Sequence, residues 1–267
     1  MSKHLSKQEI IKNKKKSIIQ LNDLLESYIS DKEKLRKADL LSKWLKDYVN
    51  YLKFEDIFDP KRNISYKRGN IVKVNLGFNL GSELGGVHYA IIIDNNNKRS
   101  CDTVTILPLS SVKENSKIYE RDLLIGNEFY NLVASKYNSM LNKAKQRLDE
   151  LNNLLPSIIA LHTLSESKEL PDDIQKKSLL EADKLHQEFN KQITTLNSEI
   201  EILQKNKDEI DLMKEGSIVK IEQIRTISKI RIWIPKTSKD PLYNISLSQP
   251  TMDKINSKLM ELFIFQK

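Results

Sequence analysis

The chain has 267 residues, of which 39% are hydrophobic and 30% are charged, and its net charge is +8. This charge is too high for one compact globule of that size, so we expect one modest core with extended helices. A single cysteine excludes a disulfide framework and a multi-cysteine zinc site. The excess of basic residues fits a polyanionic partner or simply a solvated lysine-rich surface.

No apolar run approaches the roughly 20 residues that span a bilayer, and the N-terminus lacks the apolar core of a signal peptide. We therefore expect a cytoplasmic protein with no membrane partner.

Residues 1–58 are predicted to be a helical extension, because apolar residues recur at spacings of three and four in two runs. Ser30 and Asp31 lie between the runs and predict a cap that separates two helices. The lysine cluster near the start fits either a solvated face or a phosphate contact. The cluster comprises Lys12, Lys14, Lys15 and Lys16.

The segment Tyr66–Asn95 contains five of the seven glycines in the chain, which predicts unusual backbone angles there. Residues 70–76 alternate in hydrophobicity and residues 90–93 are apolar, so the segment is predicted to be a strand, a long glycine-rich loop and a buried strand. Further strands are predicted at residues 103–109 and 119–125.

Between residues 127 and 212 the apolar period changes to between three and four, and the seams are interrupted by Ser, Pro and Asp at residues 165–173. This pattern predicts an inserted antiparallel coiled-coil hairpin, with Pro156 kinking or ending its first helix. Arms of this length would project about 50 Å. The pattern leaves open whether the hairpin binds a partner.

Strand chemistry resumes at Gly216, and residues 251–265 have the periodicity of an amphipathic helix, with Ser248 or Thr251 as its cap. Strands on both sides of the hairpin predict a discontinuous β domain of residues 59–126 and 213–267. The fold class is therefore expected to be α+β.

Two blocks carry a resemblance to a known family. The first has KRGNIV from Lys67, GSELGGV from Gly81 and AIII from Ala90, and the second is GSIVKIEQIRTISK from Gly216. In this order they resemble the MazF/PemK (Kid-like) toxins of type II toxin–antitoxin systems. The resemblance covers residues 66–111 and 216–266, and leaves out the N-terminal helices and the hairpin.

This resemblance implies an SH3-like β-barrel that forms a homodimer and cleaves single-stranded RNA, such as mRNA, without a cofactor. Cleavage would proceed by attack of the ribose 2'-OH, and a cognate antitoxin would neutralise the protein. The chemistry needs a group that removes the 2'-OH proton, a group that protonates the departing 5'-oxygen, and donors for the phosphate charge.

The family's catalytic Arg and Thr or Ser correspond to His88 and Ser110 in this sequence. Histidine ordinarily titrates near pH 6.5, so His88 suits acid–base work better than phosphate clamping. Glu222 is a third catalytic candidate. Without the resemblance, His88 and Ser110 would be interpreted as an ordinary loop histidine and a strand-end serine.

The resemblance also places other side chains near RNA. Tyr89 replaces the family's usual proline and could stack on a base, while Glu83 could contact RNA or hold the loop. The basic candidates Lys67 and Arg68 are expected to attract phosphate groups. Arg225 could bind a phosphate or form an ion pair at a dimer interface. The full set of RNA-binding candidates is Lys67, Arg68, Glu83, Tyr89, Gln223 and Arg225. The scattered histidines suggest no metal site.

Two other functions stay open at this level. The arginine-to-histidine difference at His88 is also compatible with a non-catalytic module that binds RNA or protein, or with a poison of a protein target such as gyrase. The short family connection between the two strand blocks further predicts that residues 127–212 can be deleted without unfolding the rest.

Overall fold

The computed structural model describes residues 6–114 and 117–264, so residues 265 and 266 of the resemblance and the last residue of the predicted C-terminal helix lie outside it. The chain divides into two compact units. The first comprises Met1–Phe58 and Asn75–His88, and the second comprises Asp59–Val74 and Tyr89–Lys267. The described residues form five α-helices and seven strands, which confirms the α+β class.

The first unit contains the two predicted N-terminal helices, α1 (Lys7–Ile29) and α2 (Leu35–Glu55). A capping box starts α1: the Ser6 hydroxyl accepts the Glu9 N–H, and the Glu9 carboxylate accepts the Ser6 N–H. The predicted break at Ser30 is present, but Ser30 ends α1 and the N-cap of α2 is Lys34.

The sheet has the strand order β4-β5-β3-β2-β1-β7, with β6 paired to β3 beside this path. The registered pairs are antiparallel. Within the described residues the sheet is not closed, so the barrel implied by the resemblance is not seen as a ring of strands. The strands are β1 Ile71–Asn75, β2 Val87–Ile92, β3 Thr103–Ser111, β4 Asp122–Gly126, β5 Ser217–Lys220, β6 Arg225–Ser228 and β7 Ile232–Ile234.

The long strand β3 organises this sheet. Its first half, from Thr103 to Ile106, pairs with β6, and its end, from Leu109 to Ser111, pairs with β5. A short 3₁₀ turn, Ile221–Gln223, separates β5 from β6 and redirects the chain. Because Ile221 is fully buried, this turn is anchored in the core. The second strand block is therefore broken where the sequence predicted continuous strand.

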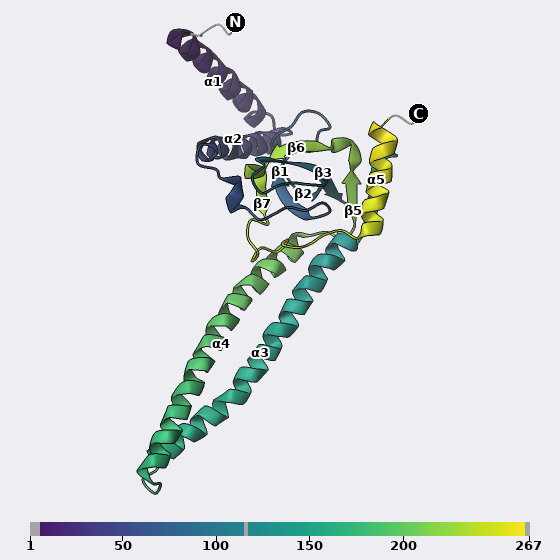
Figure 1. The fold of residues 1–267 in the computed structure, drawn as a ribbon. Helices are drawn as coiled ribbons and strands as arrows, with labels where there is room; N and C mark the ends of the chain where they lie inside the picture. The colour runs from purple at the N-terminus through teal and green to yellow at the C-terminus, as the bar shows by residue number, and fades with distance from the viewer. Residues whose placement is uncertain (1–5, 115–116, 265–267) are drawn as a thin grey trace. The chain divides into compact units, whose positions relative to one another are not determined.

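Two long helices, α3 (Glu128–Glu166) and α4 (Asp172–Leu212), run side by side in opposite directions (Figure 1). Their seam is apolar, and a bidentate ion pair between Arg147 and Glu199 spans it at 3.0 and 3.2 Å. α3 continues through Pro156, so the alternative that this proline ends the helix is wrong. The buried seam residues are Ala144, Leu151, Leu196 and Leu203.

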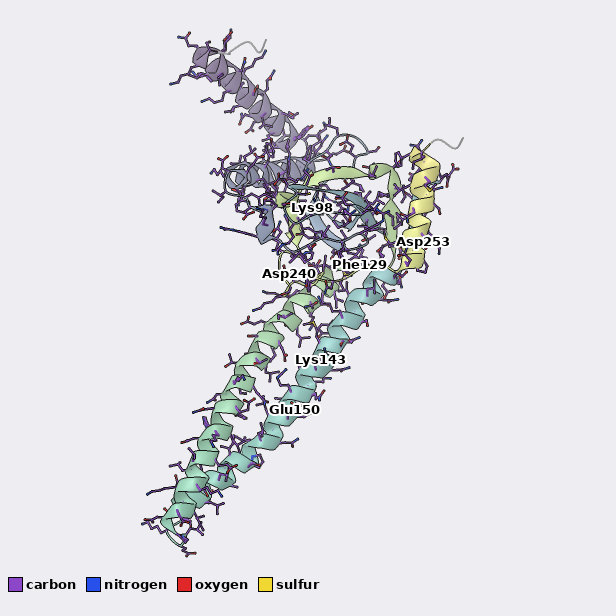
Figure 2. All side chains as sticks on the ribbon, in the orientation of Figure 1. Lys98, Phe129, Lys143, Glu150, Asp240 and Asp253 are labelled. Atoms are coloured by element: carbon purple, nitrogen blue, oxygen red, sulfur yellow. The ribbon has the colours of Figure 1, made fainter. Side chains whose placement is uncertain are left out.

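The base of this hairpin belongs to the core of the sheet. Phe129 and Val133 of α3 are 1% and 0% exposed, and they cluster with Ile71 and Ile91 of the sheet. Figure 2 labels Phe129 where α3 meets the sheet. A domain boundary at residue 127 would therefore cut through one continuous apolar cluster.

The C-terminal helix α5 (Gln249–Phe263) packs into the same cluster through Met252 and Ile255. Ser248 is its N-cap residue, but the Ser248 side chain makes no capping bond to the backbone. Instead, Glu128 of α3 accepts the Ser248 N–H at 2.6 Å and the Thr251 hydroxyl. The first residue of the hairpin thus caps the last helix.

None of the helices in the described ranges has a stretch both long and apolar enough to cross a membrane.

Candidate functional site

The glycine-rich loop of the first unit is held by its own backbone and by α2. The Gly86 N–H donates to the Gly77 carbonyl oxygen at 2.7 Å, and the side-chain oxygen of Asn75 accepts the Gly77 N–H. The Asn75 amide in turn donates to Asp47 of α2 at 3.0 Å. A Cβ on Gly85 would lie 2.7 Å from the Gly77 carbonyl oxygen, so only glycine fits there.

His88 follows this loop, in the first part of β2, and is half-buried. Its Nε2 lies 3.0 Å from the carbonyl oxygen of Gly85. Because a carbonyl oxygen only accepts hydrogen bonds, this contact assigns the hydrogen to Nε2. In the neutral ring the proton-accepting lone pair is then on Nδ1. The loop therefore fixes the tautomer as well as the position of His88.

Ser110 lies in the second unit, one residue before the end of β3, opposite Ile218 of β5. It is half-buried. A hydroxyl at a strand end can donate to a phosphate oxygen and still accept a bond itself.

Glu222 lies in the 3₁₀ turn after β5, not on a strand as predicted. Its carboxylate is exposed and pairs with Arg121, at 3.3 Å. The Arg121 side chain is 65% exposed, so the pair is solvated and weak. The sequence reasoning missed Arg121, which precedes the buried Asp122–Lys220 ion pair of 2.8 Å between β4 and β5. That buried pair fixes the backbone beside Arg121.

Gln223 and Arg225 flank the point where the 3₁₀ turn becomes β6. The Arg225 guanidinium donates to the Gln223 side chain at 2.8 Å, and Arg225 lies opposite Ile106 of β3. With Arg121 and Glu222, these residues form a polar strip around the β5–β6 turn. The strip contains two guanidinium groups that suit phosphate oxygens.

Two other predicted RNA contacts are occupied within the second unit. Arg68 donates to the carbonyl oxygen of Ile93 and to the side chain of Asn256, so it joins the residue that follows β2 to α5. The Tyr89 ring packs edge-on against Phe129, with ring centroids 4.9 Å apart. This contact gives the Tyr89 ring a role in packing.

The remaining two candidates are exposed. Lys67 has a solvated side chain, and its backbone N–H donates to Asn70. Glu83 is exposed on the loop, and its backbone N–H donates to the carbonyl oxygen of Leu80 at 3.1 Å.

The sequence reasoning also missed a buried polar cluster of Lys73, Tyr89 and Glu209. Lys73 of β1 donates to both Glu209 oxygens, at 2.8 and 3.0 Å, and the Tyr89 hydroxyl donates to the same carboxylate. Burial, with help from the Glu209 hydrogen bond, raises the pKa of the Tyr89 phenol. A lysine inside an apolar strand was the available signal, but nothing in the sequence indicated its partner on α4.

Part of the chain resembles a known family. Residues 67–164 match the family model described as PemK-like, MazF-like toxin of type II toxin-antitoxin system. These residues are therefore similar to a PemK-like toxin domain. No curated protein matches the chain.

The matched range includes the glycine-rich loop, His88 and Ser110, and continues along α3. The strands β5, β6 and β7 lie beyond it, although β3 of the domain pairs with two of them. In residues 6–114 and 117–264, no group of three or more His, Cys, Asp or Glu side chains could hold a metal ion.

Proposed function

We propose that this protein is the toxin of a type II toxin–antitoxin pair and acts as an endoribonuclease on single-stranded RNA. The family match across residues 67–164 carries the proposal, because it includes His88 and Ser110. The proposal includes the further implications of the family resemblance: an SH3-like barrel, a homodimer, a cognate antitoxin and a cytoplasmic location.

In the proposed reaction, His88 removes the proton from a ribose 2'-OH with its Nδ1 lone pair. The 2'-oxygen then forms a bond to the adjacent phosphorus, and the bond from phosphorus to the 5'-oxygen breaks. The products are a 2',3'-cyclic phosphate and a 5'-hydroxyl, whose proton comes from a second acid–base group. Our candidate is Glu222, which must first take up a proton because its carboxylate is paired with Arg121. The hydrogen bond from Nε2 to Gly85 supports this role because it orients the ring.

Donors would stabilise the charge that develops on the phosphate. We assign this role to the Ser110 hydroxyl and to Arg225, and we add Arg121 because its exposed guanidinium lies beside Glu222. Lys67 and Gln223 would contribute general contacts to the RNA chain. Arg68 and Tyr89 are left out because their polar groups are bound within the fold.

The first experiment incubates the purified protein with mixed RNA in EDTA and maps the new ends. We expect cuts at a short recurrent sequence, each leaving a cyclic phosphate. His88→Ala should slow cleavage about 100-fold or more, the usual contribution of a general base. The control is His186→Ala, which removes an exposed histidine from α4. Equal cleavage by the His88 variant and the control would refute the catalytic assignment.

A matched variant separates proton transfer from charge stabilisation. His88→Arg restores the residue type of the family but cannot accept a proton at neutral pH. If His88 is a base, this variant should be as slow as His88→Ala. If it instead cleaves like the unmodified protein, the residue acts as a cation.

The presence of histidine at this position also keeps a second function open. If the protein binds RNA in EDTA but leaves it intact, the domain is a non-catalytic binding module. If it neither binds nor cuts RNA but still arrests growth, a protein target such as gyrase becomes the better proposal.

A further inference from the structure

Helix α1 is long and has little packing within its own chain. It spans 23 residues, or about 35 Å, and none of them is buried. Ile11 and Ile18 are 40% and 58% exposed, while only Leu21, Leu25 and Tyr28 are half-buried. Because helical stability in proteins comes mostly from packing of an apolar face, a helix this exposed needs a partner.

One face of α1 has a heptad pattern, and three of its apolar residues, Leu21, Leu25 and Tyr28, are half-buried within the chain. Ile11, Ile18 and Leu25 are seven residues apart, and so are Lys14, Leu21 and Tyr28. Taken as positions a and d, these six residues form one seam over three heptads. Lys14 is the one charged residue in the seam, and such a residue selects partner and orientation at a cost in stability.

The charges on α1 are divided between its two ends. Its first half carries a basic cluster, whereas residues 17–29 contain Asp23 and Glu26 and no lysine or arginine. A parallel pair of α1 helices would place like charges together and would set Lys14 against Lys14. An antiparallel pair places each basic half beside an acidic half.

We propose that α1 pairs in antiparallel orientation with α1 of a second copy of this chain. With Ile18 opposite Leu21 of the second copy, Lys14 lies opposite the second copy's Leu25. Its ammonium group is then next to the second copy's Glu26. The interface is therefore apolar along its centre and complementary in charge at both ends. This proposed pairing of α1 helices does not depend on the proposed ribonuclease activity or on any dimer formed by the sheet.

Spin-label distances in the full-length protein test this arrangement. Cys101 is replaced by serine, and a nitroxide is attached at Gln20→Cys or, in a second sample, at Gln8→Cys. Both positions are exposed and lie off the seam. In the antiparallel pair the two labels at residue 20 have almost no axial offset. The two labels at residue 8 are offset by about 35 Å.

We expect a short distance, on the order of the width of a helix pair, at residue 20 and a long one at residue 8. Equal short distances at both positions would show a parallel pair and overturn the proposal. Absence of the short distance at residue 20, at concentrations where sedimentation shows a dimer, would show that α1 is not the interface.

Charge reversal provides a matched pair of variants. Asp23→Lys with Glu26→Lys makes both halves of α1 basic, and should remove the short distance at residue 20. Adding Lys14→Glu and Lys15→Glu restores opposite charges at facing positions of the two helices. The short distance at residue 20 should then return. A short distance that survives the first reversal would contradict the proposed orientation. If the second reversal does not restore the short distance at residue 20, although α1 stays helical by circular dichroism, the proposal also fails.

Discussion

The two ends of the helical hairpin are held in different ways. At the base, α3 joins the apolar cluster of the sheet through Phe129 and Val133, and Glu209 of α4 is bonded to Lys73 and Tyr89. Farther out, the helices pack mainly on each other, and their ion pair, Arg147 with Glu199, is about one-third exposed. The difference shows that one continuous periodic pattern can encode both a piece of core and a projecting arm.

Polar contacts reinforce this division. Lys136 donates to the carbonyl oxygens of Asp240, Pro241 and Tyr243, so α3 is bonded to the loop before α5. Burial lowers the pKa of the Lys136 ammonium. Together with the Glu128 cap on α5, these bonds explain why the hairpin base cannot be treated as a simple insertion.

The largest expected effect comes from two deletions of different length. Joining residue 127 to residue 213, as the sequence alone suggested, removes Phe129, Val133 and Glu209 and leaves Lys73 without its carboxylate. We expect that protein to be aggregated or molten. Joining Leu148 to Ser198 through a few Gly and Ser residues keeps the base and the Arg147–Glu199 pair, and should give a folded protein.

Near-ultraviolet circular dichroism and gel filtration distinguish these outcomes. The shorter deletion should retain the tertiary signal of the sheet and elute as a single species. If the longer deletion also folds, the core role of the hairpin base is wrong. If neither folds, the outer hairpin contributes to the core as well.

The next largest effect compares one carboxylate from each end of the hairpin. Glu209→Ala leaves the buried Lys73 ammonium unpaired, and should lower the free energy of unfolding by about 3–5 kcal/mol. Glu199→Ala breaks a solvated pair, and should cost about 0–1 kcal/mol. Urea unfolding followed by circular dichroism measures both, and similar costs would remove the distinction between base and arm.

The smallest effect concerns the cap of α5. Burial acts to raise the pKa of Glu128, but hydrogen bonds from Thr251 and Ser248 outweigh it and hold this pKa below its usual value. The folded state therefore favours the carboxylate, and its stabilisation is present above about pH 4.5. It is lost as the pH falls through the lower folded-state value.

Glu128→Gln should thus cost about 0.5 kcal/mol at pH 7, since solvent screening weakens a partly exposed cap. The difference in the free energy of unfolding between this variant and the unmodified protein should shrink as the pH falls below 4.5. Glu166→Gln, at the exposed outer end of α3, is the control and should show no such trend. A difference that stays constant with pH would exclude the charge of Glu128 as its cause.

Much of the fold follows from local sequence patterns. The two N-terminal helices, the strands around the glycine-rich loop, the paired long helices and the C-terminal helix all occur where periodicity predicted them. The irregular steps were missed, because a 3₁₀ turn such as Ile221–Gln223 lies within a stretch of β-branched residues. Such a turn is selected by tertiary pairing with β3, which local propensity does not report.

The site was less predictable for a similar reason. The resemblance gave His88 and Ser110, but it could not show that Arg68 bonds to Asn256 or that Tyr89 bonds to Glu209. Both partners are more than a hundred residues away in the sequence. A side chain that looks available for RNA can thus be occupied by a distant part of the same chain.

The pairing of β3 with β5 and β6 has a consequence for synthesis on the ribosome. Ser248 follows Glu128 by 120 residues, and the strands that complete the sheet emerge only after the whole hairpin. At roughly 5–20 residues per second, translation of the hairpin delays completion of the sheet by on the order of 10 s. During that interval the helices can form from local contacts, while β3 cannot yet pair with β5 and β6. The nascent chain therefore carries His88 and Ser110 well before it has the finished fold around them.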